Sequence, residues 1–175
     1  MDKFYTGVGS RETPDHVLHL MNIVAAFLNT KGYTLRSGGA KGADCAFERY
    51  SNKCDIYSIN EKHKPVSGKP SIIPDLDAYR ELVKQCCLHY KNIKSQYAKD
   101  LHTRNICQII GHIPNTIIKS DFVLCYTLNG EYVGGTTTAI RCAERFDIPV
   151  FNFGSYKTVE EMKEELHKFL KTNIK

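Results

Sequence analysis

The feature that most constrains this chain is a glycine-rich stretch between a short apolar segment and a helix-forming one. Residues 33–36 favour a strand, Gly38, Gly39 and Gly42 follow within five residues, and residues 43–50 have the composition of a helix. Glycine permits positive φ and a close approach of the backbone to a ligand. A helix that begins just past such a turn directs free N–H groups and the positive end of its dipole at the ligand. The stretch therefore predicts a site for an anion, phosphate above all.

The same stretch is also consistent with a strand-to-helix turn that needs glycine only for its shape. A second glycine-rich turn, residues 134–138, favours the ligand-binding interpretation. It follows the apolar segment 121–127 and opens a helical pattern that runs to Phe146. Two such turns, each after a buried strand, are expected to meet at the same edge of a parallel sheet.

Predicted strands and helices alternate along the chain, which indicates a parallel sheet with helices on both faces. The chain length of 175 residues is typical of a single domain, 1–175. Strands are expected at residues 4–8, 33–36, 55–59, 121–127 and 148–153, and helices at 14–31, 43–50, 136–146 and from 159 onward.

An insertion separates the third and fourth of these strands. Residues 60–74 contain three prolines and a glycine, which predicts a surface loop. Residues 76–113 have a helical pattern, expected as two helices broken near Lys99-Asp100. The whole segment 60–113 is therefore interpreted as a loop plus a helical insertion, which forms either a lid over the site or an interface.

Basic and aromatic residues are interleaved inside this insertion. Residues 79–105 carry six Lys or Arg against two acidic residues, together with Tyr79, Tyr90 and Tyr97. This pattern is typical of a surface that binds single-stranded nucleic acid. It is more often the pattern of a solvated helix face with tyrosines packed beneath it. The net charge of +5 is too modest to decide between the two.

The seven cysteines are scattered, odd in number and mostly in apolar surroundings, so they are interpreted as reduced core residues of a cytoplasmic protein. No N-terminal signal segment and no membrane-spanning apolar run is expected. The stretch Cys86-Cys87-Leu88-His89 lacks a spaced cysteine pair and a matching second half. On that ground no metal site is expected.

Several motifs together resemble the SLOG superfamily, the group that includes the DprA (Smf) proteins and the LOG phosphoribohydrolases, and are nearest to phage DprA-like proteins. They are residues 7–14 (GVGSRETP), 35–48, Arg104-Asn105 with Gln108 and Gly111, 120–123, and 134–141 through 149–152. The resemblance implies a Rossmann-like fold, a small phosphorylated nucleotide as ligand, no obligatory cofactor and a homo-oligomer.

Three functions follow from this resemblance. The first is binding of an ADP-ribose-type signal or a nucleoside phosphate, which a phage-type anti-defence protein would sequester. The second is N-glycosidic hydrolysis of a nucleotide, as in the LOG enzymes, and the third is single-stranded DNA binding, as in DprA. LOG enzymes use a PGGxGTxxE motif, but here Val133 replaces its proline, Thr137 its later glycine and Arg141 its glutamate. Arginine cannot activate water as a carboxylate does, which argues against LOG-type catalysis at that position.

The candidate site residues come from the ends of the expected strands and from the insertion. Asp44 and Glu48 are four residues apart and share a helical face, and with Glu12 they are the candidate catalytic carboxylates. The expected ligand-binding residues are Gly9, Ser10, Arg11, Ser37, Gly38, Gly39, Gly42, Ala43, Asp44, Arg104, Asn105, Thr127, Gly134, Gly135, Thr136, Thr137, Thr138 and Arg141.

Overall fold

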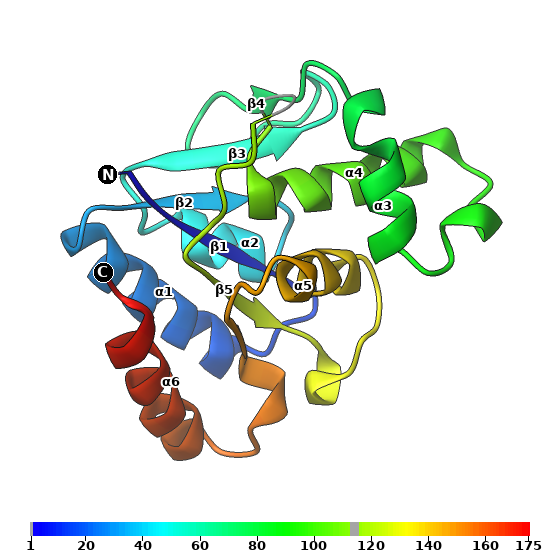
Figure 1. Ribbon diagram of the computed structural model, residues 1–175. Coiled ribbons are helices and arrows are strands. Elements are labelled where there is room, and N and C mark those ends of the chain that lie inside the picture. The colour runs from blue at the N-terminus through cyan, green and yellow to red at the C-terminus, as the bar shows by residue number, and fades with distance from the viewer. Residues whose placement is uncertain (1, 113–115) are drawn as a thin grey trace.

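The computed structural model describes residues 2–112 and 116–175, and these residues form a six-stranded parallel sheet (Figure 1). The strand order is β4-β3-β2-β1-β5-β6. The strands are β1 (Lys3–Gly9), β2 (Tyr33–Ser37), β3 (Cys54–Ser58), β4 (Ser71–Ile72), β5 (Phe122–Tyr126) and β6 (Val150–Asn152). The predicted parallel α/β fold is confirmed.

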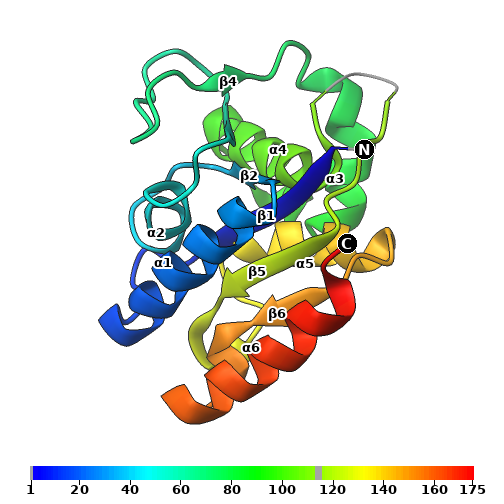
Figure 2. The ribbon, with the colours of Figure 1, turned by 90° about the vertical axis from the view of Figure 1, so that its left-hand side faces the viewer.

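Helices cover both faces of the sheet, as Figures 1 and 2 show from two directions. The helices are α1 (Asp15–Thr30), α2 (Ala43–Glu48), α3 (Arg80–Cys86), α4 (Gln96–Ile110), α5 (Thr136–Arg145) and α6 (Val159–Asn173). One apolar cluster joins α1, α2 and α6 to one face, and a second joins α3, α4 and α5 to the other. The strand β5 shows the division, because Phe122 and Leu124 belong to the first cluster and Val123 to the second.

The order in which strands are added to the parallel sheet reverses at β1. The chain adds β2, β3 and β4 successively on one side of β1 and then returns to add β5 on the other side. Gly9 at the end of β1 pairs with Tyr126 at the end of β5. In open parallel sheets, a crevice forms beyond the carboxyl ends of the two strands at such a reversal. The residues that follow Gly9 and Tyr126 are therefore placed to form a site.

Two predicted boundaries were wrong. The expected break in the insertion at Lys99-Asp100 lies inside α4, and the helices are instead separated by residues 87–95. Ser95 starts α4, because its hydroxyl accepts the Ala98 amide at 3.3 Å. The segment predicted as loop 60–74 contains β4, which extends the sheet beside β3. The insertion therefore lies between β4 and β5, and its expected last residue, Ile113, is outside the described residues, as is Met1.

Across residues 2–112 and 116–175, each helix is either too short or too polar to cross a lipid bilayer.

Candidate functional site

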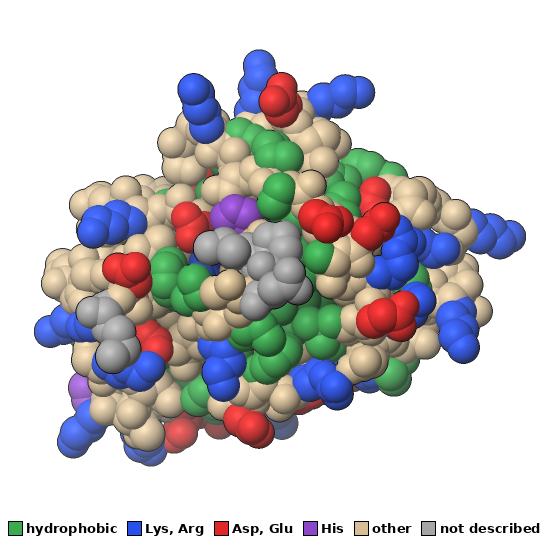
Figure 3. Space-filling view, turned by 45° about the horizontal axis from the view of Figure 1, so that its top comes forward, with side chains coloured by type: hydrophobic (Ala, Val, Ile, Leu, Met, Phe, Trp, Pro, Cys, Tyr) green, Lys and Arg blue, Asp and Glu red, His purple; other side chains and the backbone are tan. Residues whose placement is uncertain are grey.

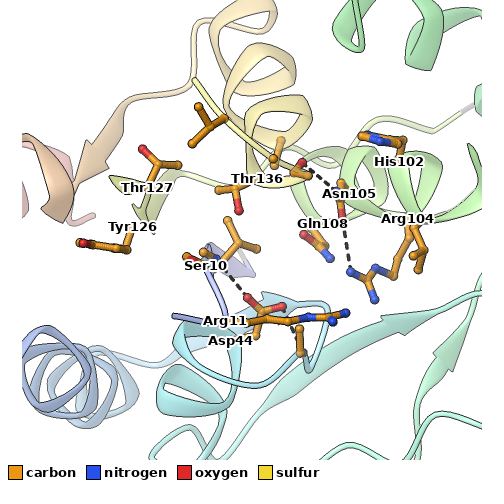
Figure 4. Close-up of a pocket in the computed structure, with 18 of the residues that line it drawn as sticks. Ser10, Arg11, Asp44, His102, Arg104, Asn105, Gln108, Tyr126, Thr127 and Thr136 are labelled. Carbon is orange, nitrogen blue, oxygen red and sulfur yellow. Dashed lines mark hydrogen bonds between the residues drawn. The ribbon is translucent and has the colours of Figure 1, made fainter. Parts of the chain in front are cut away.

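A cavity of about 560 Å³ opens at the carboxyl ends of β1 and β5 (Figure 4). Four segments form its wall: the end of β1 with the turn after it, the first glycine-rich loop, one side of α4, and the chain from β5 into α5. We call this cavity the rim cleft. Its lining residues include Val8, Gly9, Ser10, Arg11, Glu12, Ala40, Asp44, Leu101, His102, Arg104, Asn105, Gln108, Tyr126, Thr127, Leu128, Val133, Gly134, Gly135 and Thr136.

Asp44 fixes the shape of the first glycine-rich loop. Its Oδ1 accepts the amide of Gly9 at 3.0 Å, and its Oδ2 accepts the amides of Gly38 and Ala40 at 3.2 and 3.3 Å. The carboxylate thus satisfies backbone donors from both β1 and the loop after β2. The amide of Gly38, which we expected to bind phosphate, is already bonded within the protein.

Burial raises the pKa of Asp44 from its ordinary value near 3.8 to about 6, although the charge of Arg104 and the three amide donors act in the opposite direction. The pKa of Arg104 is lowered, first by burial and partly by Arg11, while Asp44 opposes this change. At neutral pH, Asp44 is therefore ionised and Arg104 carries its positive charge close to it.

The glycines of the first loop are needed for packing against the chain itself. Gly42 has φ +84°, and a Cβ there would lie 2.5 Å from the carbonyl oxygen of Ser10. A Cβ on Gly38 would lie 2.5 Å from Nε2 of Gln108 on α4. Gly39 has φ +64°, with His63 Nε2 2.6 Å from the position of a Cβ. These contacts bring the loop against the turn after β1 and against α4.

Arg104 and Arg11 supply positive charge to the rim cleft, and Figure 4 shows their side chains extending into the same region. Arg104 donates weakly to the carbonyl of Gly38 and to Oδ1 of Asn105, both at 3.4 Å. Its Nε is buried and has no hydrogen-bond partner among the described residues, and the same holds for Nε2 of Gln108. Buried donors of this kind are usually satisfied, so these two point to an acceptor from a ligand or water.

The second glycine-rich turn forms the opposite wall. Nδ2 of Asn105 donates to the carbonyl of Gly135 at 2.9 Å, which ties the turn to α4. Thr136 begins α5 and lines the cleft. Thr127 is held at the end of β5, because its hydroxyl accepts Nδ2 of Asn152 at 2.7 Å.

The structure brings part of the predicted site together. The predicted residues on the wall of the rim cleft are Gly9, Ser10, Arg11, Glu12, Asp44, Arg104, Asn105, Thr127, Gly134, Gly135 and Thr136. Eight predicted ligand-binding residues are not among the lining residues: Ser37, Gly38, Gly39, Gly42, Ala43, Thr137, Thr138 and Arg141. Gly38 is connected to the cleft indirectly, because its carbonyl oxygen accepts a hydrogen bond from Arg104, which lines the cleft.

Two further candidates, Arg141 and Glu48, lie outside the rim cleft. Arg141 lines a smaller neighbouring cavity with Thr137 and Thr138, and its guanidinium lies over the ring of Tyr132, 5.8 Å from the centroid. Glu48 is buried away from the lining residues, and its Oε1 accepts the amide of Ser67 at 2.6 Å. Asp44 lines the cleft, but both of its carboxylate oxygens accept hydrogen bonds from backbone N–H groups. Of the candidate catalytic carboxylates, Glu12 is the exposed one on the cleft wall.

Sequence reasoning missed one side of α4. Ala98, Leu101, His102 and Gln108 line the cleft together with the predicted Asn105. These positions recur at three- and four-residue spacing, which is the period of a single helical face. This helical spacing is visible in the sequence, but it does not show what a polar residue on that face contacts. Tyr126 was missed because it ends a strand whose residues are all buried.

These elements define a Rossmann-like α/β domain with a cleft at its topological switch point. No family model and no curated relative matches the chain. Its fold is similar to that of DNA processing protein A (DprA) from Helicobacter pylori, a structure described for its unique single-stranded DNA binding mode. The TM-score is 0.58 at 15% identity, over 98% of this chain and 81% of that one. The likeness shows a DprA-like fold, whereas SLOG membership and a phage type remain predictions.

Proposed function

We propose that the chain binds single-stranded DNA, with part of the phosphate backbone seated in the rim cleft. The observation that carries the proposal is the pair of buried donors, Arg104 Nε and Gln108 Nε2, which have no partner among the described residues and lie on a cleft next to Arg11. Phosphate oxygens are strong acceptors for such donors, and arginine binds them with two parallel hydrogen bonds. Phosphate contacts supply most of the sequence-independent affinity for DNA.

Apolar side chains at the mouth of the cleft are suited to nucleobases. Leu128 and Val133 line the cleft and are 60% and 48% exposed, and Tyr97, one residue before the lining residue Ala98, is 60% exposed. Bases of single-stranded nucleic acid stack on exposed aromatic rings without regard to sequence. The fold similarity to a protein that binds single-stranded DNA supports the same proposal.

The basic segment 79–105 contributes less than its composition indicates. Tyr79 and Tyr90 are buried in the core, so Tyr97 is the one of its three tyrosines that is exposed. Figure 3 shows Lys and Arg side chains dispersed among Asp and Glu on the face in view. Lys91 and Lys94 are exposed and remain available to a DNA strand.

A second candidate is a free phosphorylated nucleotide, of the ADP-ribose type or a nucleoside phosphate. The volume of the cleft, about 560 Å³, favours this alternative because it lies within the usual range for small-molecule sites. Sequestration of a signalling nucleotide would then be its activity. LOG-type hydrolysis is not proposed, because Arg141 occupies the position of the LOG glutamate and is not among the residues that line the cleft.

The experiment is fluorescence anisotropy with a labelled oligothymidylate, followed by competition with duplex DNA and with ADP-ribose. The proposal predicts tight binding of the single strand, weak competition by the duplex, and a loss of roughly tenfold or more in affinity for Arg104→Ala, since a charged hydrogen bond contributes about 1.5–3 kcal/mol. Lys168→Ala, on α6, removes the same charge from the opposite face of the sheet and should leave affinity unchanged. If ADP-ribose binds and the oligonucleotide does not, the second candidate replaces the first.

A further inference from the structure

We propose that Cys87, His89 and His102 bind a zinc ion beside the rim cleft. The thiol sulfur and the two imidazoles bring three ligand atoms within 4.8 Å of one another. Cys87 directly follows α3, His89 lies in the turn after it, and His102 comes from α4. A thiolate with two imidazoles is a donor set typical of zinc.

The distances are close to those that a zinc ion would impose. Cys87 Sγ lies 3.9 and 3.8 Å from Nδ1 and Nε2 of His89. With Zn–S near 2.3 Å and Zn–N near 2.05 Å, tetrahedral geometry places sulfur and nitrogen about 3.6 Å apart. The rings of His89 and His102 meet edge to face, with centroids 5.4 Å apart. Small side-chain rotations therefore suffice to converge the three ligands on one point.

His102 is already oriented by a second residue. Its Nδ1 is hydrogen-bonded to the hydroxyl of Thr138 at 2.7 Å, which leaves Nε2 free to bind metal. Metal-binding histidines almost always have such a partner on the other ring nitrogen.

The thiol of Cys87 must release its proton to solvent when the metal binds. A zinc ion deprotonates a coordinating thiol outright. Since the site has three protein ligands and His89 is exposed, the fourth position is open to water.

The sequence prediction of no metal site considered Cys86-Cys87-Leu88-His89 alone. The third ligand comes from another helix, thirteen residues beyond His89, so no local motif reveals it. Bound zinc would fix the connection between α3 and α4, residues 87–95, against α4. It would also hold His102, which lines the rim cleft. The site is independent of DNA binding and is tested without DNA.

The test uses the metal-free full chain titrated with Co²⁺, which reports thiolate coordination by a charge-transfer absorption band. The wild type should show this band, saturate at one equivalent, and lose the band when Zn²⁺ is added. Cys87→Ala and His89→Gln should abolish saturable binding, while the matched controls Cys86→Ala and His19→Gln should retain it. His89 is exposed, so its variant is expected to fold, and circular dichroism checks this.

Thr138→Val tests the positioning of His102. It removes the hydroxyl at nearly constant shape, and we expect Co²⁺ affinity to fall by about 10- to 100-fold with the charge-transfer band retained. The proposal is overturned if the wild type gives no charge-transfer band, or if the Cys86 and Cys87 variants behave alike. In that case the Cys87–His89 contact is an ordinary S–H···N hydrogen bond.

Discussion

Asp44 accepts the backbone N–H of Gly9 at 3.0 Å, and this bond joins the end of β1 to the glycine-rich loop after β2. The same carboxylate accepts two amides of its own loop, so a single side chain sets the position of one wall of the rim cleft. Hydrogen bonds within the protein therefore hold the loop in place. The groups left to bind an anion are therefore the arginine side chains and the second glycine-rich turn.

This arrangement predicts that the stability of the protein depends on pH through the protonation of Asp44. Its pKa is raised in the folded state to about 6, so the folded state binds the proton more tightly than the unfolded state. The resulting stabilisation is present below pH ~4 and is lost as the pH rises through about 6. A shift of about two pKa units corresponds to about 3 kcal/mol.

The measurement is urea unfolding of wild type and Asp44→Asn at a series of pH values. Asparagine does not titrate, so the free energy of unfolding of wild type minus that of the variant should fall by up to about 3 kcal/mol between pH 4 and 7. A difference that stays flat, or that rises with pH, would mean that the three amide bonds and Arg104 outweigh burial.

Two glycine substitutions separate shape from ligand contact. Gly135 has φ −66° and its Cβ would meet Asn105 Nδ2 at an ordinary 3.4 Å, so Gly135→Val should fold and weaken DNA binding by filling the cleft wall. Gly39→Val instead meets His63 and Ile56 and forces a positive φ, which costs about 1–3 kcal/mol. Gly39→Val is therefore expected to lose stability, whereas Gly135→Val is expected to keep the fold.

Thermal unfolding and DNA anisotropy on the two variants check this distinction. Full affinity in a folded Gly135→Val protein would remove the second turn from the site.

Arg11 is expected to contact phosphate. It is exposed on the cleft wall, so replacing it should cost little stability. For single strands, log K falls against log salt with a slope of about −0.7 for each phosphate neutralised. Arg11→Ala should therefore make the slope about 0.7 shallower in an anisotropy series from low to moderate salt. An unchanged slope would place the phosphates elsewhere.

Lys91 and Lys94 test whether the strand extends from the cleft over the connection between α3 and α4. Both side chains are exposed, so the double alanine variant should fold normally. We expect its DNA affinity to fall at low salt and to converge with that of wild type at high salt, because exposed charges are strongly screened. Equal affinity at all salt concentrations would confine the DNA to the cleft.

Much of the fold could be predicted because its signals are local. The run 122–126 is apolar on both faces, as expected of a central parallel strand. Gly32, with φ +78°, follows the end of α1. The two-residue strand β4 has no such pattern. The break at 87–95 was missed because its tyrosine and isoleucine positions continue the apolar spacing of a helix.

The site was less accessible to sequence reasoning because its contacts join distant residues. Proximity of the two glycine-rich turns follows from parallel topology alone. The approach of Gln108 to Gly38 and the contact between His102 and Thr138 depend on how α4 lies across the sheet. No local periodicity encodes that placement.

The central claim is tested most directly by titrating the ¹⁵N-labelled protein with oligothymidylate and mapping the amide shifts by NMR. The account predicts that the largest changes cluster at residues 9–11, at Ala40 and at residues 134–136, with side-chain shifts at Gln108. Changes confined to α1 and α6, or the absence of any change at saturating oligonucleotide, would contradict it.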